Sequence, residues 1–515
     1  MTQRPPRRGA TAEEHALEYQ TQLARQDHAA AAAALEAALR LRPDWTDARY
    51  NLGAMLTQLE RYADAEAAYR SVIAADPDRR LAYRMLGNVL HRQGRIAELL
   101  QVLSAARRRH AEDFDLESFE LLALLFGEDA SAAELFERHR AYGARLERAI
   151  TPLPPAPPPD PRRPLRVGYL SGDLCGHPVA QFLRPVLEHR DRSSFEAFCY
   201  SVGARVDASS REIAAQADAW RAASAYTDAQ LADAIRGDRI DVLVDLSGHS
   251  GISRLPVFAR QPARLQVSWL GYLHSTGLTR IQYRITDAFA DPGPGAEGLH
   301  TEALIRMPHS QWCYRPLAAG AAPPTPRGAF TFGSFNQVAK LSASSRRLWI
   351  RILREMPDAR LALTGVPEGQ ARSELLAEFA AGGIDANRLD IAPHVAVAEY
   401  FARIGAAGIA LDPTPYSGGT TTLDALWMGV PVVTLAGERS VSRSAASILR
   451  TLGLQDWVAR TPQEYVAIAL RAAREPGALA ALRASLRPRL RASPLMDERR
   501  FAADFEALLR RLAYA

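Results

Sequence analysis

The chain has 515 residues but contains almost no lysine. Of its 63 lysine and arginine residues, Lys340 is the sole lysine, so arginine stands wherever arginine will serve. A lysine ammonium is a compact charge with three rotatable donors, which the planar guanidinium group does not reproduce. Lys340 is therefore a candidate for a functional position, and the alternative is chance survival in a biased composition.

Cysteine is scarce as well. Cys175, Cys199 and Cys313 form an odd, widely spaced set without a C-x-x-C pair, which argues against a disulfide framework and a structural zinc site. Asp113-Phe-Asp115 has a D-x-D form, but it falls in a helical region and is interpreted as a solvated helix face. We therefore expect no metal site and no bound cofactor, and a reducing, cytoplasmic environment.

Long apolar runs and charge blocks are also missing. No apolar run reaches the roughly 18 residues that a membrane-spanning helix needs, and no apolar segment follows the three arginines of Met1–Gly9. The net charge of +5 is spread over the whole chain, without a basic run that alternates with aromatics. These features disfavour a secretory signal, a membrane anchor and a nucleic-acid partner.

A 34-residue repeat is present near the N-terminus. The same residue types recur at this interval in the pairs Ala31 and Ala65, Pro43 and Pro77, Asp44 and Asp78, Leu52 and Leu86, and Gly53 and Gly87. The spacing resembles that of tetratricopeptide repeats, in which each unit is a helix pair. Residues 1–150 are therefore predicted to form an all-α domain. The concave face of such a domain is expected to bind an extended peptide. The alternative is a helical spacer, because fewer than three full repeats are evident.

A proline-rich segment separates this region from the rest of the chain. Residues 151–164 contain eight prolines and are predicted to be a stiff linker at a domain boundary. Beyond it, short β-rich runs alternate with helical stretches, a pattern that predicts parallel sheets covered by helices. Two series of runs, separated by the Pro/Ala/Gly-rich Leu317–Gly328, predict two doubly wound α/β lobes at 165–320 and 325–515.

The expected strands of the two lobes are Leu165–Leu170, Ala197–Val202, Ile240–Leu246 and Leu265–Leu270, then Phe330–Phe335, Leu361–Leu363, Ile409–Leu411 and Val430–Leu435. Ligands of such sheets bind at the carboxyl ends of the strands. We therefore expect the site in a cleft between the lobes.

The strongest motif is Ser417-Gly-Gly-Thr-Thr-Thr-Leu-Asp424, between an expected strand and a helix. Glycine lets a ligand approach the backbone, and a helix start offers free N–H groups and a positive dipole end. The motif predicts a diphosphate site built by Gly419, Thr420, Thr421 and Thr422. Asp424, one turn into the helix, is placed to accept hydrogen bonds from ribose. The alternative is an ordinary glycine-rich loop with a threonine cap.

Three further candidates follow other expected strands. Gln337 and Lys340 lie in Ser334-Phe-Asn-Gln-Val-Ala-Lys340, where the ammonium could neutralise a departing diphosphate. His177, in Ser171-Gly-Asp-Leu-Cys-Gly-His-Pro178, precedes a proline suited to a helix start and could contact a substrate or act as a base. His249 ends a similar segment, and for each histidine a structural role is the alternative.

In the same order along the chain, the repeats and the motifs GDLCGHP, DLSGHS, VSWLGY, YRITD, GSFNQVAK and GGTTTLDALWMGVPVVTLAG resemble the O-GlcNAc transferase and SPINDLY family. The resemblance covers nearly the whole chain. It implies a GT-B fold of two Rossmann-like lobes, a nucleotide-sugar donor, inversion at the anomeric carbon, and serine or threonine acceptors on proteins.

Carried over to this sequence, the resemblance assigns roles to individual residues. Lys340 matches the essential diphosphate lysine of the family, and Gln337 a residue that contacts the nucleotide. Thr420 and Thr421 match phosphate-contacting threonines, and Asp424 the ribose-binding acid. His177 matches the active-site histidine of the first lobe. His249 remains a weaker catalytic candidate.

Some positions depart from the family pattern. Gly419 stands where O-GlcNAc transferases typically have a histidine in the sequence G-H-T-T. The segment around Val397 and Tyr400 lacks the family's nucleotide-contacting lysine and histidine. TGLTRIQYRITDAFADP is more like the SPINDLY branch, which uses GDP-fucose, whereas Gln337 is more like the O-GlcNAc branch. The expected donor is UDP-GlcNAc, with GDP-fucose or another hexose donor as the alternative.

Two other functions are consistent with the same residues. The loss of the loop histidine is compatible with a scaffold that binds a nucleotide-sugar without turnover, although Lys340, Asp424 and His177 together favour catalysis. The acceptor could also be a small molecule or a glycan, with the repeats serving assembly. The sequence does not predict an oligomeric state.

Overall fold

A computed structural model of the chain describes residues 10–318, 320 and 328–514. The chain divides into two compact units, one formed by residues up to Leu116 together with Val366–Leu375, and one by Glu117–Gly365 with Leu376–Ala515. The division falls within the helical region, before the expected domain end at residue 150. Residues 117–149 belong to the second unit, in which the helix Ala132–Ala149 contacts the helix Leu255–Ala259 of the first lobe.

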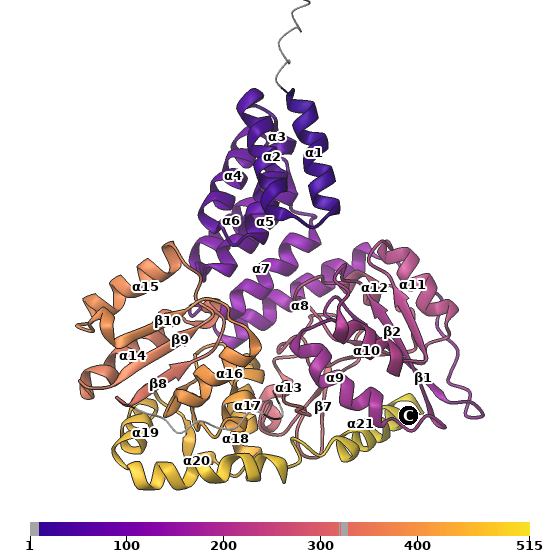
Figure 1. Cartoon of the computed structure of the whole chain (residues 1–515). Coiled ribbons are helices and arrows are strands. Elements are labelled where there is room, and N and C mark those ends of the chain that lie inside the picture. The colour runs from indigo at the N-terminus through magenta and orange to yellow at the C-terminus, as the bar shows by residue number, and fades with distance from the viewer. Residues whose placement is uncertain (1–9, 319, 321–327, 515) are drawn as a thin grey trace, which may run out of the picture. The chain divides into compact units, whose positions relative to one another are not determined.

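The first unit consists of antiparallel helix pairs (Figure 1). Its helices are α1 (Ala12–Ala24), α2 (His28–Leu41), α3 (Thr46–Gln58), α4 (Tyr62–Ala75), α5 (Arg80–Arg92) and α6 (Ile96–Arg109). The starts of α2, α4 and α6 are 34 residues apart, which confirms the repeat. Gly53 is needed for close packing, because a Cβ atom there would lie 2.8 Å from the Tyr69 ring. Asp113, at the D-x-D sequence, accepts hydrogen bonds from the N–H groups of Asp115 and Leu116 and so caps the next helix.

Helices α7 (Phe114–Phe126) and α8 (Ala132–Ala149) lead into the second unit. The Ser118 hydroxyl lies 2.8 Å from His249 Nδ1, and His139 Nε2 lies 2.6 Å from the Tyr272 hydroxyl. The Pro-rich segment that follows is extended and held along the first lobe. Leu153 N–H donates to the Arg260 carbonyl, and Arg163 pairs with Asp241 through two bonds of 2.8 Å.

Helix α8 approaches the first lobe through a glycine-to-glycine contact, and this gives a prediction. A Cβ atom on Gly143 would lie 1.8 Å from the Gly277 carbonyl oxygen. We therefore expect Gly143→Ala to lower the free energy of unfolding by about 2–4 kcal/mol, because backbone atoms must separate. The matched control is Gly237→Ala at the end of a helix, where a Cβ meets nothing within 4 Å. Urea denaturation of both variants checks the difference, and an equal effect of the two substitutions would contradict it.

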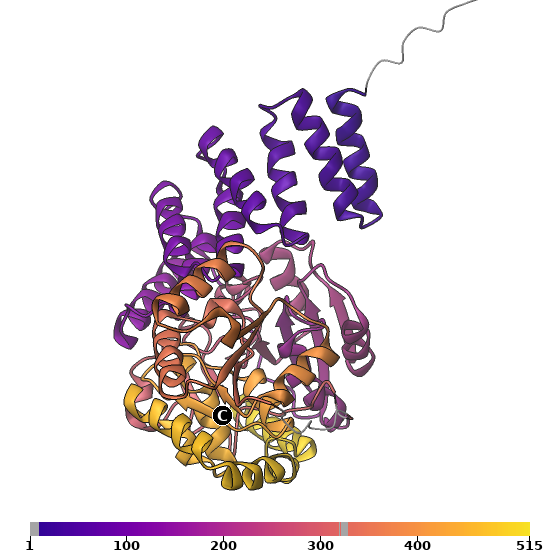
Figure 2. The same ribbon diagram turned by 60° about the vertical axis from the view of Figure 1, so that its left-hand side comes forward.

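Two parallel sheets form the core of the second unit (Figures 1 and 2). The first has the order β3-β2-β1-β4-β5-β6-β7, and the second β10-β9-β8-β11-β12-β13. The strands of the first are β1 (Leu165–Ser171), β2 (Phe195–Ser201), β3 (Ala219–Ala222), β4 (Val242–Asp245), β5 (Leu265–Ser268), β6 (Tyr283–Thr286) and β7 (Ala303–Arg306). Those of the second are β8 (Thr331–Ser334), β9 (Arg360–Thr364), β10 (Leu389–Ala392), β11 (Ile409–Leu411), β12 (Val432–Leu435) and β13 (Val458–Ala459). These sheets confirm the two predicted α/β lobes.

The strand order reverses once in each sheet. In the first sheet the reversal lies between β1 and β4, and in the second between β8 and β11. At such a switch point the loops leave the sheet in opposite directions and open a crevice at the carboxyl ends of the strands. All four of these strands were expected from the sequence, and each is followed by one of the candidate motifs.

Helices cover both sheets. Those of the first lobe are α9 (Pro178–His189), α10 (Ala208–Gln216), α11 (Asp228–Gly237), α12 (Leu255–Ala259) and α13 (Gly293–Glu297). Those of the second are α14 (Ala343–Glu355), α15 (Gln370–Ala381), α16 (Val397–Ala406), α17 (Thr420–Trp427), α18 (Ser444–Thr451), α19 (Pro462–Arg474) and α20 (Pro476–Arg491), with short 3-10 turns such as η1 (Val338–Lys340). The last helix, α21 (Glu498–Ala513), returns to the first lobe and packs against α9. Phe505 on α21 lies 4.6 Å, between ring centroids, from Trp269.

The structure also describes the cysteines and the apolar character of the helices. All three cysteines are buried and unpaired. Among the described residues, no helix combines the length and apolar character needed to cross a bilayer.

Candidate functional site

Lys340 lies at the switch point of the second sheet, at the end of η1 after β8. Its Nζ donates to the Ser417 carbonyl at 3.0 Å and lies 4.2 Å from the centre of the Tyr416 ring. Burial lowers the pKa of Lys340 to about 8, against the charge of Asp412, which raises it. The ammonium is thus held at the loop after β11, with one proton bound to a carbonyl and others available to a ligand.

The Gly-Thr loop joins β11 to the start of α17. Gly419 is the N-cap residue and provides no side-chain cap. Within residues 10–318, 320 and 328–514, the N–H groups of Thr420 and Thr421 have no hydrogen-bond partner. Both threonines are partly exposed, and the Thr421 hydroxyl donates to Asn336 Oδ1 at 2.9 Å, which ties this loop to the loop after β8. Free N–H groups at the positive end of a helix suit an anion such as a diphosphate.

The structure brings Lys340, Gly419, Thr420 and Thr421 together at one switch point. Gln337, exposed at the start of η1, lies on the same loop as Lys340. The predicted grouping of these residues around one ligand is therefore geometrically consistent.

Thr422 and Asp424 are turned into the protein instead. The Thr422 side chain is buried, and its hydroxyl donates to the Gly418 carbonyl at 3.1 Å. Asp424 is 3% exposed and accepts the hydroxyl protons of Tyr314 at 2.6 Å and Tyr400 at 3.1 Å, one on each oxygen. Burial raises the pKa of Asp424 to about 7. A ribose could reach this carboxyl only by sharing it with the two tyrosines, and Thr422 stabilises the loop rather than facing a ligand.

Asp412 is a site residue that the sequence did not reveal, whereas Asn336 belongs to the predicted Ser334–Lys340 motif. Asp412 follows β11 directly, is 3% exposed, and accepts hydrogen bonds of 2.7 Å from the Gly418 N–H and the Thr434 hydroxyl. Asn336 is buried after β8. The signal was available, because polar residues that directly follow the strands at a switch point face the ligand edge of the sheet.

His177 lies at the switch point of the first sheet as the N-cap residue of α9. Its Nδ1 accepts a hydrogen bond from the Val179 N–H at 3.3 Å, and its side chain is 43% exposed. Burial lowers the pKa of His177, and the nearby Asp173 carboxylate opposes that effect. With Nδ1 as the acceptor, the neutral ring carries its proton on Nε2. In this state His177 can donate a hydrogen bond to a substrate, but it cannot take a proton at Nε2.

His249 is placed differently. It is 2% exposed, its Nδ1 lies 2.8 Å from the Ser118 hydroxyl, and its Nε2 lies 2.9 Å from the Thr276 carbonyl. Burial lowers the pKa of His249 well below its ordinary value. Both ring nitrogens are therefore occupied between helix α7 and the first lobe. This geometry corrects the catalytic role expected for His249, because no nitrogen is left for proton transfer. The adjoining Trp269 and Tyr272 are likewise fully buried, so the aromatic segment is a packed turn.

The Trp312 indole leaves little room for a side chain at position 419. A Cβ atom on Gly419 would lie 3.3 Å from the Trp312 six-membered ring. Trp312 is 4% exposed and also packs on Phe182 of α9, with ring centroids 5.3 Å apart. The indole thus takes the space next to the loop in which a larger side chain at 419 would lie.

A single substitution at Gly419 and a double substitution at Gly419 and Trp312 test that explanation. We expect Gly419→His to weaken nucleoside diphosphate binding by about tenfold, roughly 1.4 kcal/mol, because the imidazole and the indole compete for one volume. Gly419→His combined with Trp312→Leu is expected to recover most of that loss. Calorimetric titration with UDP measures both variants, and strictly additive losses would show that the two positions are independent.

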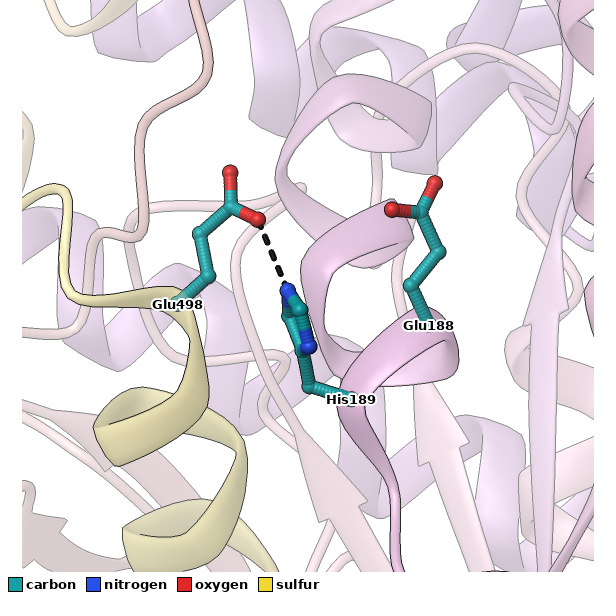
Figure 3. A group of neighbouring side chains, drawn as sticks. All are labelled: Glu188, His189 and Glu498. Atoms are coloured by element: carbon teal, nitrogen blue, oxygen red, sulfur yellow. Dashed lines mark hydrogen bonds and ion pairs between the residues drawn. The ribbon is translucent and has the colours of Figure 1, made fainter.

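Three potential metal ligands come together elsewhere, at Glu188, His189 and Glu498 (Figure 3). His189 Nε2 lies 3.0 Å from a Glu498 oxygen. The Arg315 guanidinium pairs with both carboxylates, at 2.7 Å from Glu188 and 2.7 Å from Glu498. The hydrogen bond from Arg315 lowers the pKa of Glu188. An arginine therefore supplies the positive charge here, and the group fastens α9 to α21 rather than forming a metal site.

Two parallel sheets, each with a polar loop at its switch point, form a two-lobed α/β fold of the GT-B type. The profile described as Glycosyl transferase family 41 matches residues 158–314 and 317–505, and that of the tetratricopeptide repeat matches 20–79 and 56–114. The chain therefore belongs to glycosyl transferase family 41.

Individual proteins are similar over long stretches. The structure of a mutant O-GlcNAc transferase from Thermobaculum terrenum is 35% identical, with a TM-score of 0.91 over 99% of this chain and 98% of that chain. Probable UDP-N-acetylglucosamine–peptide N-acetylglucosaminyltransferase SPINDLY of Solanum lycopersicum is 35% identical over 402 residues, which cover 76% of this chain and 43% of that protein. The corresponding protein SEC of Arabidopsis thaliana is 30% identical over 357 residues, 66% of this chain and 36% of that protein. The chain spans less than half the length of these two plant relatives.

Proposed function

We propose that this protein is an inverting glycosyltransferase that moves a sugar, GlcNAc from UDP-GlcNAc, to serine or threonine hydroxyls of proteins. The observation that carries the proposal is the position of Lys340. A half-buried ammonium binds the Ser417 carbonyl, in the loop that leads to two free helix N–H groups, at the switch point of a sheet in a family 41 chain. Charge develops on the leaving diphosphate as the glycosidic bond breaks, and fixed positive groups there stabilise the transition state.

The proposed reaction needs no metal ion or bound cofactor. Lys340 and the N-terminus of α17 together provide positive charge for the diphosphate, while Thr420 and Thr421 provide hydroxyl groups. The acceptor hydroxyl attacks the anomeric carbon from the face opposite the diphosphate, and the bond between that carbon and the diphosphate oxygen breaks. The proton of the hydroxyl passes to water, and the nucleoside diphosphate leaves with its charge stabilised by Lys340 and the N-terminus of α17. His177, with its proton on Nε2, positions the reacting groups as a hydrogen-bond donor.

The repeats are proposed to bind the protein acceptor. Stacked helix pairs present a concave surface that accommodates an extended peptide. The names of the plant relatives and of the Thermobaculum protein support a peptide acceptor and GlcNAc as the sugar. We place the protein in the cytoplasm, in line with its three unpaired cysteines.

GDP-fucose is the second candidate donor. It is supported by Gly419, which stands in the loop where O-GlcNAc transferases typically have a histidine. A scaffold that binds nucleotide-sugars without turnover is the remaining alternative.

Labelled transfer tests the proposal. UDP-[¹⁴C]GlcNAc and GDP-[¹⁴C]fucose are offered separately to the protein with a lysate of acceptor proteins, with and without a chelator, and the modified residue is located by mass spectrometry. Transfer of GlcNAc to serine or threonine that survives chelation is the expected result. Transfer of fucose alone would reassign the donor. Binding of both nucleotides without transfer would favour the scaffold.

A further inference from the structure

We propose that Asp412 is the positioning residue for Lys340, fixing both the place and the charge of the ammonium that meets the leaving diphosphate. This role rests on the proposed function. It goes beyond that function by naming the residue that positions the Lys340 ammonium and favours its charged form. Asp412 follows β11, whereas Lys340 follows β8, so the pair spans the switch point.

The Asp412 carboxylate is itself tightly held. Oδ1 accepts the Gly418 N–H and Oδ2 accepts the Thr434 hydroxyl of β12, each at 2.7 Å. Its main-chain oxygen accepts the Tyr465 hydroxyl at 2.9 Å. The carboxylate therefore has one position, and through Gly418 it also sets the path of the Gly-Thr loop.

That loop in turn holds Lys340. Nζ donates to the carbonyl of Ser417, the residue immediately before Gly418. The Ser417 hydroxyl is anchored on both sides, since it donates to the Val441 carbonyl and accepts from the Ser444 N–H, both at 3.0 Å. The Ser417 carbonyl and the Gly418 N–H belong to one planar peptide unit. Without the Asp412 carboxylate this unit can rotate and turn the carbonyl away from the ammonium, although the Ser417 side chain stays anchored.

Asp412 also acts on Lys340 through charge. Burial lowers the pKa of Lys340 to about 8, and the Asp412 carboxylate opposes this. Burial raises the pKa of Asp412 to about 7, and Lys340 opposes that in turn. Two titratable groups contact the pair among the described residues: the Tyr416 ring lies 4.2 Å from the Lys340 Nζ, and the Tyr465 hydroxyl donates to the Asp412 main-chain oxygen. Burial raises the pKa of Tyr416 to about 12 and that of Tyr465 well above its ordinary value, so both stay neutral between pH 6 and 9. Each member of the pair therefore favours the charged form of the other, against the effect of burial.

The single lysine makes a direct test possible. A tag-free chain labelled with ¹³C,¹⁵N-lysine gives one side-chain NMR signal, that of Lys340, whose pH titration yields its pKa without any substrate. We expect Asp412→Asn to move the titration midpoint down by about one pH unit, because a carboxylate that favours the ammonium is removed. The alkaline limb of the transfer rate is expected to move by the same amount.

Two further variants complete the experiment. Asp390→Asn, on β10 of the same sheet, removes an exposed carboxylate and is expected to leave both the midpoint and the rate unchanged. Thr434→Val keeps the Asp412 carboxylate but removes one of its hydrogen bonds. Thr434→Val is expected to lower the midpoint of the Lys340 titration by less than Asp412→Asn does. It replaces Asp412→Asn in the test if that variant does not fold.

The results separate this inference from the proposed function. A folded Asp412→Asn protein with a wild-type midpoint and a wild-type alkaline limb would overturn the role of Asp412. If in that case Lys340→Ala had no transfer activity, the proposed function would stand. If Lys340→Ala transferred sugar normally, the role given to Lys340 would fail. If the wild type transferred no sugar from either donor, the proposed function itself would fail.

Discussion

Lys340→Ala is expected to reduce sugar transfer by at least about 10³-fold, close to 4 kcal/mol of transition-state stabilisation, without loss of the fold. In the part of the chain that the structure describes, the ammonium contacts the Ser417 carbonyl and the Tyr416 ring alone, so its removal leaves no buried charge there unpaired except Asp412. Burial already raises the pKa of Asp412 to about 7, so this carboxyl can take up a proton when its partner is gone. Initial rates of labelled transfer and a thermal melt of the same sample check both parts.

Lys340→Arg is the informative companion. The guanidinium is planar and larger, and it cannot occupy the small site between the Ser417 carbonyl and the Tyr416 ring in the same way. We expect it to restore less than about a tenth of the wild-type rate. Full activity of the arginine variant would show that positive charge alone suffices, and that the survival of one lysine in the chain is an accident of composition.

His139→Gln is expected to make the protein less sensitive to acid. His139 of α8 is fully buried, with Nδ1 2.6 Å from the Leu135 carbonyl and Nε2 2.6 Å from the Tyr272 hydroxyl. Burial lowers the pKa of His139 to about 4. The unfolded chain binds a proton near pH 6.5 and the folded chain does not, so stability from this group is present above that pH and is lost as pH falls toward 4.

The difference between the two proteins isolates the histidine. Buried carboxyls with raised pKa values, such as Asp412 and Asp424, act in the opposite direction and are common to both proteins. Relative to the variant, the wild type should lose about 2 kcal/mol of unfolding free energy between pH 7.5 and pH 5. Urea denaturation at both pH values measures this. His394→Gln, at an exposed position, is the control, and a pH-independent effect of His139→Gln would refute the explanation.

The central strands were predictable because burial on both faces produces continuous apolar runs. β4, β8 and β11 fall within the expected segments, and β1 extends one residue beyond its segment. The strands that were not expected lie toward the sheet edges or carry polar residues. β3 is only partly buried, and β10 contains the exposed Asp390. β6 contains Arg284, which is buried and donates a hydrogen bond to the Tyr272 carbonyl. Their patterns resemble those of loops, and the partners that stabilise them are distant in sequence.

The candidate site divides in the same way. Lys340 and the Gly-Thr loop were recognisable because their chemistry is local: a rare residue type and a glycine-rich helix start. The surroundings of Asp424 were not, because Tyr314 lies 110 positions away along the chain. The same holds for His249, whose partner Ser118 is on a helix that the sequence assigned to another domain. The expected boundary at residue 150 therefore differs from the compact units, since residues 117–149 read as part of the repeats but belong to the second unit.

The central claim is that the loops after β8 and β11 hold the diphosphate of a nucleotide-sugar. Calorimetric titration of wild type and Lys340→Ala with UDP and with UMP tests it most directly. If the claim is right, the wild type binds UDP at least about tenfold more tightly than UMP, and most of that preference disappears in the variant. Equal affinities for UDP and UMP in the wild type, or an undiminished preference without Lys340, would contradict it.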